Sequence, residues 1–189
     1  FTTGCRGVSY YEAPPEYDGE CQARILTNTT DARLIAVDAL TGERCSFFGD
    51  QGEINLTIGM GNDPRIANFQ TSPPGIVSGN AVVGGWVIDN RSVGPPSGVV
   101  RAFNAITGEF AWAWDMGRPA NTGEPLRGEV YTRGTPNVWS LFSVDEELGL
   151  IYAPTGNETP DYFGGYRMEV SDEYASSVVA IEGATGNVR

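Results

Sequence analysis

A few side chains occupy positions where their chemistry could serve a bound ligand. The pair Asp89-Asn90 ends an apolar stretch, Asn157 follows Thr155-Gly156, Trp139 closes the run Thr135-Pro-Asn-Val-Trp139, and Arg6 lies near the first residue. Carboxylate and amide oxygens suit a hard cation, an indole offers a flat stacking surface, and a guanidinium pairs two carboxylate oxygens at once. Each position also has an ordinary explanation. Asp-Asn and Gly-Asn pairs form turns, tryptophans fill cores, and arginines make surface ion pairs.

The residue types that are missing narrow the chemistry further. All 12 basic residues are arginine, and histidine and lysine are absent. Without histidine, the chain lacks the commonest general base and the commonest transition-metal ligand. Its 3 cysteines are too few and too widely spaced for a zinc site. We therefore expect any bound metal to be a hard cation held by oxygen atoms.

Charge and composition exclude several classes of protein. The net charge is −12, so nucleic acid is an unfavourable partner. The chain is 40% hydrophobic, with 25 Gly and 12 Pro, which predicts a packed globular domain rich in turns. It has no apolar run of the roughly 18 residues that a membrane-spanning helix needs. Because Phe1 leads directly into structured-looking sequence, we expect any export signal or membrane anchor to lie outside this chain.

One pattern recurs three times along the chain and predicts its architecture. It joins a short apolar strand to a polar turn that glycine closes. The copies are Leu34-Ile-Ala-Val-Asp-Ala-Leu-Thr-Gly-Glu43, Val100-Arg-Ala-Phe-Asn-Ala-Ile-Thr-Gly-Glu109 and Val178-Val-Ala-Ile-Glu-Gly-Ala-Thr-Gly-Asn187. Repeated all-β units are typical of propellers and solenoids.

The repeat and its flanking apolar runs predict an all-β chain built from four-stranded antiparallel units. Strands are expected near 5–11, 23–28, 33–38 and 44–48, then 69–77, 81–88, 98–103 and 110–115, then 140–145, 149–154 and 176–182. These define blades at about 1–50, 69–116 and 139–189, the last incomplete. We therefore interpret the chain as about two and three-quarter blades of a larger β-propeller. Open blade edges of this kind allow self-association.

The strand assignment also bears on the cysteines. If strands 23–28, 33–38 and 44–48 form a meander, Cys21 and Cys45 both flank the turn around 38–42. We therefore predict a Cys21–Cys45 disulfide if any bond forms, with Cys5 free. The alternative is three buried thiols.

Further motifs follow one another in a set order. They are Cys5-Arg-Gly-Val-Ser-Tyr-Tyr11, Gln70-Thr-Ser-Pro-Pro74, Val83-Gly-Gly-Trp-Val-Ile-Asp-Asn90, Pro96-Ser-Gly-Val-Val-Arg-Ala-Phe103, Tyr131-Thr-Arg-Gly-Thr-Pro-Asn-Val-Trp139 and Pro154-Thr-Gly-Asn-Glu-Thr-Pro-Asp-Tyr-Phe-Gly-Gly165. With the repeat Ala-x-Asp-x-x-Thr-Gly-x-x-x-Trp, they resemble the membrane-bound quinoprotein dehydrogenases of the glucose, quinate and polyol type. These enzymes depend on pyrroloquinoline quinone (PQQ). The resemblance covers essentially the whole chain and implies a propeller of eight blades.

The resemblance assigns roles to individual residues. Trp139 matches the tryptophan on which the family stacks PQQ, and Arg6 matches the arginine at the cofactor carboxylates. Asp89 and Asn157 match the family's metal ligands for Ca²⁺ or Mg²⁺. Asn90 would assist in the same shell, and Thr159 would donate its hydroxyl to the cofactor.

The resemblance also marks residues as structural. Trp112, at the end of the second repeat, matches the docking tryptophan that packs between blades, whereas the first repeat has Ser46 at that position. Trp114, Arg101 and Arg133 are likewise expected to be structural. The acidic run 145–147 is expected to be a solvated hairpin turn.

The implied function is oxidation of a sugar, polyol or cyclic hydroxy acid by hydride transfer to PQQ. Electrons would then pass to ubiquinone at the periplasmic face of the bacterial inner membrane. The family's catalytic aspartate and a PQQ-contacting lysine would lie beyond residue 189, so the chain alone is expected to be inactive. Thr2 stands at about the position where glucose-oxidising members carry a histidine, so either the substrate-side contacts differ or this end of the chain was altered, and glucose is in doubt as the substrate. The alternative is a non-catalytic propeller scaffold of the outer-membrane assembly type.

Overall fold

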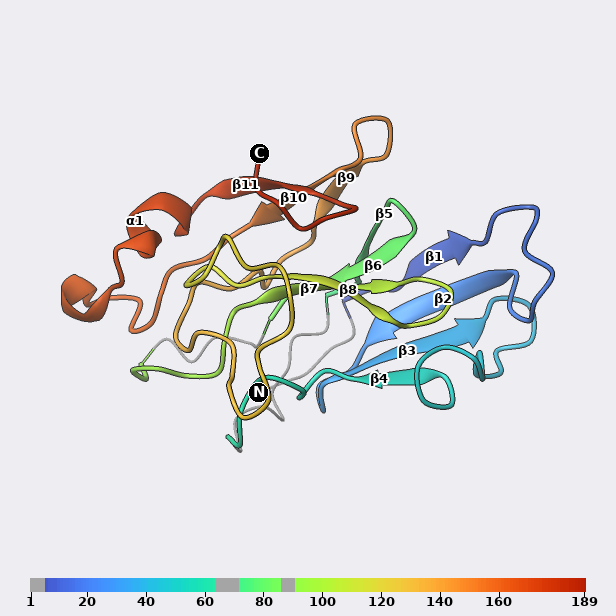
Figure 1. Cartoon of the computed structure of the whole chain (residues 1–189), viewed down its shortest axis with the longest axis horizontal. Helices are drawn as coiled ribbons and strands as arrows, with labels where there is room; N and C mark the ends of the chain where they lie inside the picture. The colour runs from blue at the N-terminus through green and yellow to red at the C-terminus, as the bar shows by residue number, and fades with distance from the viewer. Residues whose placement is uncertain (1–5, 64–71, 86–90) are drawn as a thin grey trace.

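The structure, a computed structural model, describes residues 6–63, 72–85 and 91–189. Figure 1 shows three antiparallel sheets arranged side by side in chain order. The sheets are nearly all the regular structure that the described residues contain. A 3₁₀ turn (Gly164–Tyr166) and one short helix, α1 (Val170–Tyr174), are the exceptions. No helix among these residues is long and apolar enough to cross a membrane.

Each sheet follows the chain as a meander. The first contains β1 (Ser9–Glu12), β2 (Ala23–Asn28), β3 (Arg33–Asp38) and β4 (Glu53–Asn55) in that order. The second contains β5 (Gly75–Val77), β6 (Asn80–Val83), β7 (Val100–Asn104) and β8 (Phe110–Trp114). The third contains β9 (Ser143–Asp145), β10 (Leu150–Pro154) and β11 (Val178–Glu182), and Val188 bridges back to Ile181. The fold predicted from the repeat, an open part of a β-propeller with four-stranded antiparallel blades, is confirmed.

The core lies between the sheets and leaves the middle sheet covered on both faces. One cluster joins Leu26 and Leu34 of the first sheet to Ala81 and Val83 of the second. The other joins Val82 to side chains of the third sheet. Because successive residues of a strand point to opposite faces, β6 contributes to both clusters and all four of its residues are buried. Blades of a propeller stack face to face in this way.

The repeated sequence forms a similar glycine-closed turn in each unit, and an Asp or Asn side chain caps the turn in the first two. Asp38 Oδ1 accepts the backbone N–H groups of the second and third residues that follow it, at 2.9 and 2.8 Å. Asn104 does the same at 2.9 Å for each. The glycine that closes each turn has a left-handed φ of +75°, +75° and +78° at Gly42, Gly108 and Gly186. Glycine adopts this conformation without steric cost, so the Asx-Thr-Gly pattern is explained locally.

The predicted strand at 44–48 is wrong. Only Arg44 bridges to Val37, after which the chain turns, and the fourth strand of the first sheet is β4. Residues 33–35 of β3 pair with β4, so two separate segments share the open edge of one strand. The loop between them buries Phe48 completely. Burial of this aromatic ring in the core explains the interruption.

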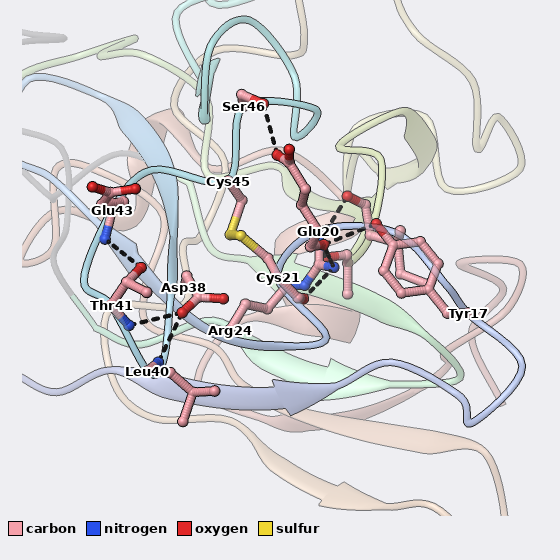
Figure 2. Close-up of a disulfide and its surroundings, with 12 residues drawn as sticks. Tyr17, Glu20, Cys21, Arg24, Asp38, Leu40, Thr41, Glu43, Cys45 and Ser46 are labelled. Carbon is pink, nitrogen blue, oxygen red and sulfur yellow. Dashed lines mark hydrogen bonds between the residues drawn. A yellow bond between two sulfur atoms is a disulfide. The ribbon is translucent and has the colours of Figure 1, made fainter.

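A disulfide joins Cys21 to Cys45, with their Cα atoms 5.8 Å apart. This is the pair expected from the strand order. Cys5 lies outside the described residues. Figure 2 shows the bond at the end of the first sheet, next to Arg24, Glu20 and Ser46.

Candidate functional site

The structure brings Arg6 and Trp139 together although 132 residues lie between them in the chain. Arg6 Nη1 donates a hydrogen bond of 2.7 Å to the Trp139 carbonyl oxygen, and the guanidinium carbon lies 6.0 Å from the centre of the indole ring. The hydroxyl of Ser72 donates to the same carbonyl at 3.1 Å. The Trp139 backbone is thus held from two other segments, while 49% of the residue stays exposed. An anchored backbone with an exposed ring suits a stacking platform.

The indole edge of Trp139 rests against the backbone that carries Asn157. A Cβ atom on Gly156 would lie 3.1 Å from Trp139 Nε1, so only glycine fits there without displacing the ring. The Gly156 N–H donates to the Asn137 carbonyl at 2.9 Å, which fixes this close approach. Asn157 is therefore placed beside the platform, at the start of the long connection from β10 to β11.

Hydrogen bonds to residues 174–177 hold the segment that contains Asn157. The Ser176 hydroxyl donates to Asn157 Oδ1 at 2.7 Å, and the Ser176 N–H donates to the Gly156 carbonyl at 2.9 Å. Thr155 adds bonds to the carbonyls of Tyr174 and Ser177. These contacts orient the Asn157 carboxamide, whose oxygen has a second lone pair for a cation.

Thr159 is buried, with 3% of its surface exposed, and its hydroxyl has no hydrogen-bond partner among the described residues. Its neighbour Glu158 differs, because it accepts from the Met168 N–H at 2.8 Å and from the Ser171 hydroxyl. Leaving a buried hydroxyl unpaired costs free energy, so such groups commonly serve a ligand. The donor set fits PQQ in this respect, since Thr159 retains a free hydrogen bond.

Two of the predicted residues, Asp89 and Asn90, lie outside the described residues. Within the described part of the chain, no three His, Cys, Asp or Glu side chains form a group that could hold a metal ion. Asn157 is the one predicted metal ligand that can be located. An oxygen donor beside an aromatic platform and a guanidinium could bind a flat, anionic molecule together with a hard cation.

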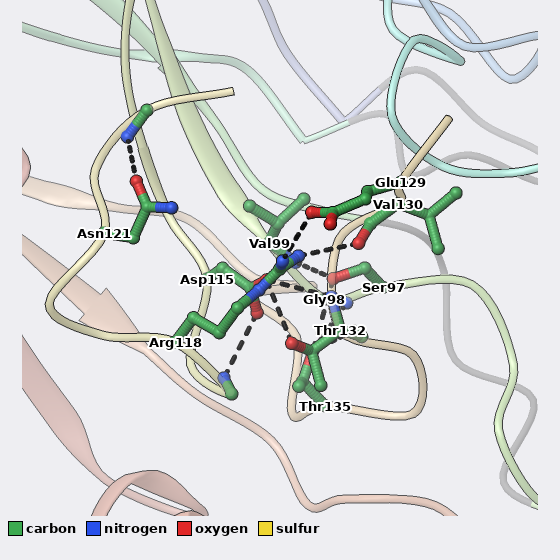
Figure 3. A network of polar contacts seen from close by, with 12 residues as sticks. Ser97, Gly98, Val99, Asp115, Arg118, Asn121, Glu129, Val130, Thr132 and Thr135 are labelled. Carbon is green, nitrogen blue, oxygen red and sulfur yellow. Dashed lines mark hydrogen bonds and ion pairs between the residues drawn. The ribbon is translucent and has the colours of Figure 1, made fainter. Parts of the chain in front are cut away.

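A second polar cluster, centred on Asp115, has a different character (Figure 3). The buried Asp115 carboxylate accepts the N–H and hydroxyl of Thr132 at 2.9 and 3.0 Å and the N–H of Gly117 at 3.1 Å, and it pairs with Arg118. Its hydrogen-bonding capacity is used within the protein. We regard this cluster as scaffold that holds the insertion leading to Trp139.

Arg101 supports the same insertion. It is completely buried, and it donates to the carbonyls of Leu56 and Ile58 at 2.8 and 3.1 Å. Its guanidinium carbon lies 5.7 Å from the centre of the Tyr131 ring. Burial lowers the pKa of Arg101 to about 10 and raises the pKa of Tyr131 to about 12. Arg101 therefore stays charged at neutral pH and links three segments, in the structural role expected for it.

The other expected structural residues also lie in scaffold positions. Trp112 and Trp114 are buried between the second and third sheets. Arg133 links Asp63 to the Gly94 carbonyl. The acidic run 145–147 begins at the last residue of β9 and continues into the turn to β10, and Glu146 also accepts the Ser78 N–H at 3.2 Å.

Sequence reasoning missed the residues that orient the site. These are Ser72, Glu158 and Ser176. Each makes a hydrogen bond to a residue that is well separated from it in the chain. Only Glu158 gave a sequence signal, since it stands between two nominated residues. A lone serine in a loop has no pattern that distinguishes it.

Comparison with known proteins identifies the family of this chain. The family model described as "Glucose/ethanol/alcohol dehydrogenase, beta-propeller domain", the PQQ model, matches residues 1–189. The large subunit of glycerol dehydrogenase from Gluconobacter oxydans (strain 621H) is 42% identical over 100% of this chain and 26% of its own length. Quinoprotein glucose dehydrogenase from Escherichia coli (strain K12) is 39% identical over 97% of the chain and 24% of its own length. Quinate/shikimate dehydrogenase (quinone) from Acinetobacter baylyi (strain ATCC 33305 / BD413 / ADP1) is 37% identical over 96% and 25%.

A solved structure supports the fold. A europium-containing methanol dehydrogenase superposes with a TM-score of 0.62 at 20% identity, over 97% of this chain and 31% of the other. The chain spans about a quarter of the length of the curated relatives it matches. Because the family model covers all 189 residues, this chain belongs to the family of PQQ-dependent dehydrogenase β-propellers.

Proposed function

We propose that this chain forms part of the cofactor site of a PQQ-dependent dehydrogenase that oxidises a sugar, polyol or cyclic hydroxy acid. The observation that carries the proposal is the pairing of Arg6 with the exposed, anchored ring of Trp139. The relatives are named for glycerol, quinate or shikimate, and glucose, all of which are alcohols with several hydroxyl groups.

Each residue has a distinct task in this proposal. Trp139 stacks against one face of the planar cofactor, and Arg6 pairs with its carboxylates. Thr159 donates its unused hydroxyl to the cofactor. Asn157, together with Asp89 and Asn90, supplies oxygen ligands for Ca²⁺ or Mg²⁺.

When bound, PQQ supplies the hydride-accepting quinone, and the cation polarises the reactive carbonyl. The chain's own residues bind and orient these groups. The general base that takes the hydroxyl proton is assigned to a part of the propeller beyond residue 189, so the chain alone is inactive. In the whole enzyme, electrons pass to ubiquinone at the periplasmic face of the inner membrane.

Calorimetric titration with PQQ in the presence of excess Ca²⁺ tests the proposal. The titration uses the complete propeller that contains this chain. Binding should be saturable, should require Ca²⁺, and should weaken about ten-fold or more in Trp139→Ala, since loss of one stacking partner costs ~1.4 kcal/mol. Asp89→Ala should lose the dependence on Ca²⁺. Phe47→Ala, which removes an aromatic side chain that is 73% exposed, is the matched control and should leave binding unchanged.

The alternative, a non-catalytic scaffold, gives the opposite result. A scaffold propeller has no reason to pair Arg6 with an exposed tryptophan, and it should release no heat on addition of PQQ with either Ca²⁺ or Mg²⁺. That outcome would refute the proposed enzyme function.

A further inference from the structure

The joint between the second and third sheets is built around a tryptophan. Trp112 of β8 is 1% exposed, and its Nε1 donates to the Gly183 carbonyl at 2.8 Å. The ring lies over Gly186, where a Cβ atom would come within 2.7 Å of it. Asn80 of β6 donates to the same Gly183 carbonyl at 2.9 Å. One carbonyl of the repeat turn thus receives two donors from the preceding unit.

The joint between the first and second sheets uses the corresponding turn but has no tryptophan. Ser46 stands at the tryptophan position. The backbone fills the gap, because the Gly49 N–H donates to the Thr107 carbonyl at 2.9 Å. A Cβ atom on Gly108 would lie 2.6 Å from the Gly49 nitrogen. The 45–52 loop therefore packs against Gly108, as the indole ring of Trp112 packs against Gly186.

Arg24 supplies the missing donors. Ala105 occupies the same place in its turn as Gly183 does in the next one, two residues before the Thr-Gly pair. Arg24 Nη1 donates to the carbonyls of Ala105 and Ile106 at 3.2 and 2.8 Å. The Ala105 turn thus receives a guanidinium in place of an amide and an indole.

Arg24 occupies the position of Asn80 within its own sheet. The Ala39 N–H donates to the carbonyl of the residue before Arg24, and the Ala105 N–H donates to that of the residue before Asn80, each at 2.9 Å. The longer arginine reaches two carbonyls from a position where asparagine reaches one. Arg24 is 1% exposed, and the acceptors of all its hydrogen bonds are backbone carbonyls.

The disulfide supports both halves of this joint (Figure 2). Arg24 Nη2 donates to the carbonyl of Cys21 at 2.6 Å, and Cys21 has a left-handed φ of 57°. The disulfide partner of Cys21, Cys45, begins the loop that places Gly49 against the second sheet. The guanidinium carbon also lies 5.7 Å from the centre of the Tyr17 ring. The bond therefore ties the residue that orients Arg24 to the loop that docks beside it.

We propose that Arg24, held in place by the Cys21–Cys45 disulfide, is the docking group of the first unit. Because of this disulfide, the joint between the first and second sheets is sensitive to thiol reductants, whereas the joint between the second and third sheets is not. A dithiol would attack one sulfur, form a mixed disulfide, and leave as its own cyclic disulfide. Two electrons and two protons pass to the protein, which gains two thiols. Cys21 and the 45–52 loop are then no longer linked, and the contacts of Arg24 and Gly49 with the second sheet weaken. This inference is independent of the proposed cofactor site.

Amide hydrogen exchange, followed by mass spectrometry on the purified protein with and without dithiothreitol, tests it. We expect exchange in peptides covering 45–52 and 103–108 to accelerate about ten-fold, as loss of one charge-assisted hydrogen bond would produce. Peptides covering 180–187, at the tryptophan joint, should be unchanged and serve as the internal control. Unchanged exchange at 45–52 and 103–108 after confirmed reduction, or equal acceleration at 180–187, would overturn the proposal.

Variants separate the disulfide from the arginine. Cys21→Ser combined with Cys45→Ser should reproduce the effect of the reductant without it. Arg24→Met keeps an unbranched apolar chain but removes the donors, and should accelerate exchange at 103–108 even in the oxidised protein. Arg33→Met, on the adjacent strand with its charge paired to Asp31 and Glu53, is the matched control and should have no effect at 103–108. Equal exchange in Arg24→Met and Arg33→Met would show that Arg24 is not the docking group. If Arg24→Met does not fold, the comparison of the reduced and oxidised protein still tests whether this joint is sensitive to thiol reductants.

Discussion

Two long insertions, 115–142 and 155–177, connect consecutive strands and use their polar groups in opposite ways. In the first, the Asp115 carboxylate gathers donors from Thr132, Gly117 and Arg118 (Figure 3). In the second, Glu158 is equally well paired, but the hydroxyl of Thr159 and one carboxylate oxygen of Asp161 are buried without a partner among the described residues. The Asp115 carboxylate of the first insertion is therefore fully paired within the protein. In the second insertion, Thr159 and Asp161 each keep a polar atom that has no partner among the described residues.

Exposed aromatic side chains are more numerous in the second insertion. Tyr162, Phe163 and Tyr166 of the second insertion are all largely exposed, and the rings of Phe163 and Tyr166 contact each other edge to face. The first insertion ends in the half-exposed Trp139. The difference teaches that a fully paired network marks scaffold, while unpaired buried groups beside an exposed ring mark a place for a ligand. The predictions below test that distinction.

The largest effect is expected from Asp115→Ala. The change leaves the donors of Thr132, Gly117 and Arg118 without their common acceptor, which should cost about 3 kcal/mol of unfolding free energy. Urea denaturation measures the loss. Asp115→Asn retains one acceptor oxygen and should cost less. If Asp115→Ala weakened PQQ binding by the folded protein while leaving stability intact, the scaffold role would be wrong.

A smaller effect is expected from Glu158→Ala. It removes the acceptor for the Met168 N–H and the Ser171 hydroxyl, so the second insertion should lose about 1–3 kcal/mol of local stability. Hydrogen exchange in peptides covering 160–175 should accelerate, with no change around Asp115. Glu169→Ala serves as the comparison, because it removes a nearby carboxylate that makes no hydrogen bond or ion pair among the described residues. Equal exchange in the two variants would argue that Glu158 does not hold this loop.

Thr159→Val should separate stability from binding. Valine has the same shape as threonine without the hydroxyl that lacks a partner, so the unfolding free energy should be unchanged or should rise by up to about 1 kcal/mol. PQQ affinity should nevertheless fall several-fold, because the cofactor loses a donor. Thermal denaturation and calorimetric titration give the two numbers. A marked loss of stability would mean that the hydroxyl already has a partner in the folded protein.

The smallest effect concerns pH. Burial raises the pKa of Asp161 above its usual 3.8, and the nearby Arg167 only partly opposes this. The folded state therefore favours the protonated acid, and stability should fall slightly as pH rises from 3.8 through the raised pKa. Asp161→Asn should remove that component in urea denaturation measured at a series of pH values. An unchanged pH profile would indicate that Asp161 is solvated.

Much of the architecture followed from local patterns in the sequence. The repeat predicted the strands at 23–28 and 33–38 within a residue, because alternation and the Asx-Thr-Gly turn act over a few neighbouring residues. The strand at 44–48 was wrong because burial of Phe48, a tertiary effect, overrode the local pattern. The structure places Arg6 beside Trp139, but the cofactor-site roles of both residues, like those of Asp89 and Asn90, stay predictions.

By itself, then, the sequence determined the repeated unit, its capped turns and the set of residue types available for a cofactor, since these depend on short-range geometry and composition. Only the tertiary structure decided which groups were left unpaired and what joins one unit to the next. The Thr159 hydroxyl lacks a partner among the described residues, and Arg24 donates to the turn whose counterpart at the next joint receives Asn80 and a tryptophan, because segments distant in the chain meet there. The free energy of a buried hydrogen bond depends on whether both partners are present, and the packing of the sheets decides which partners come together.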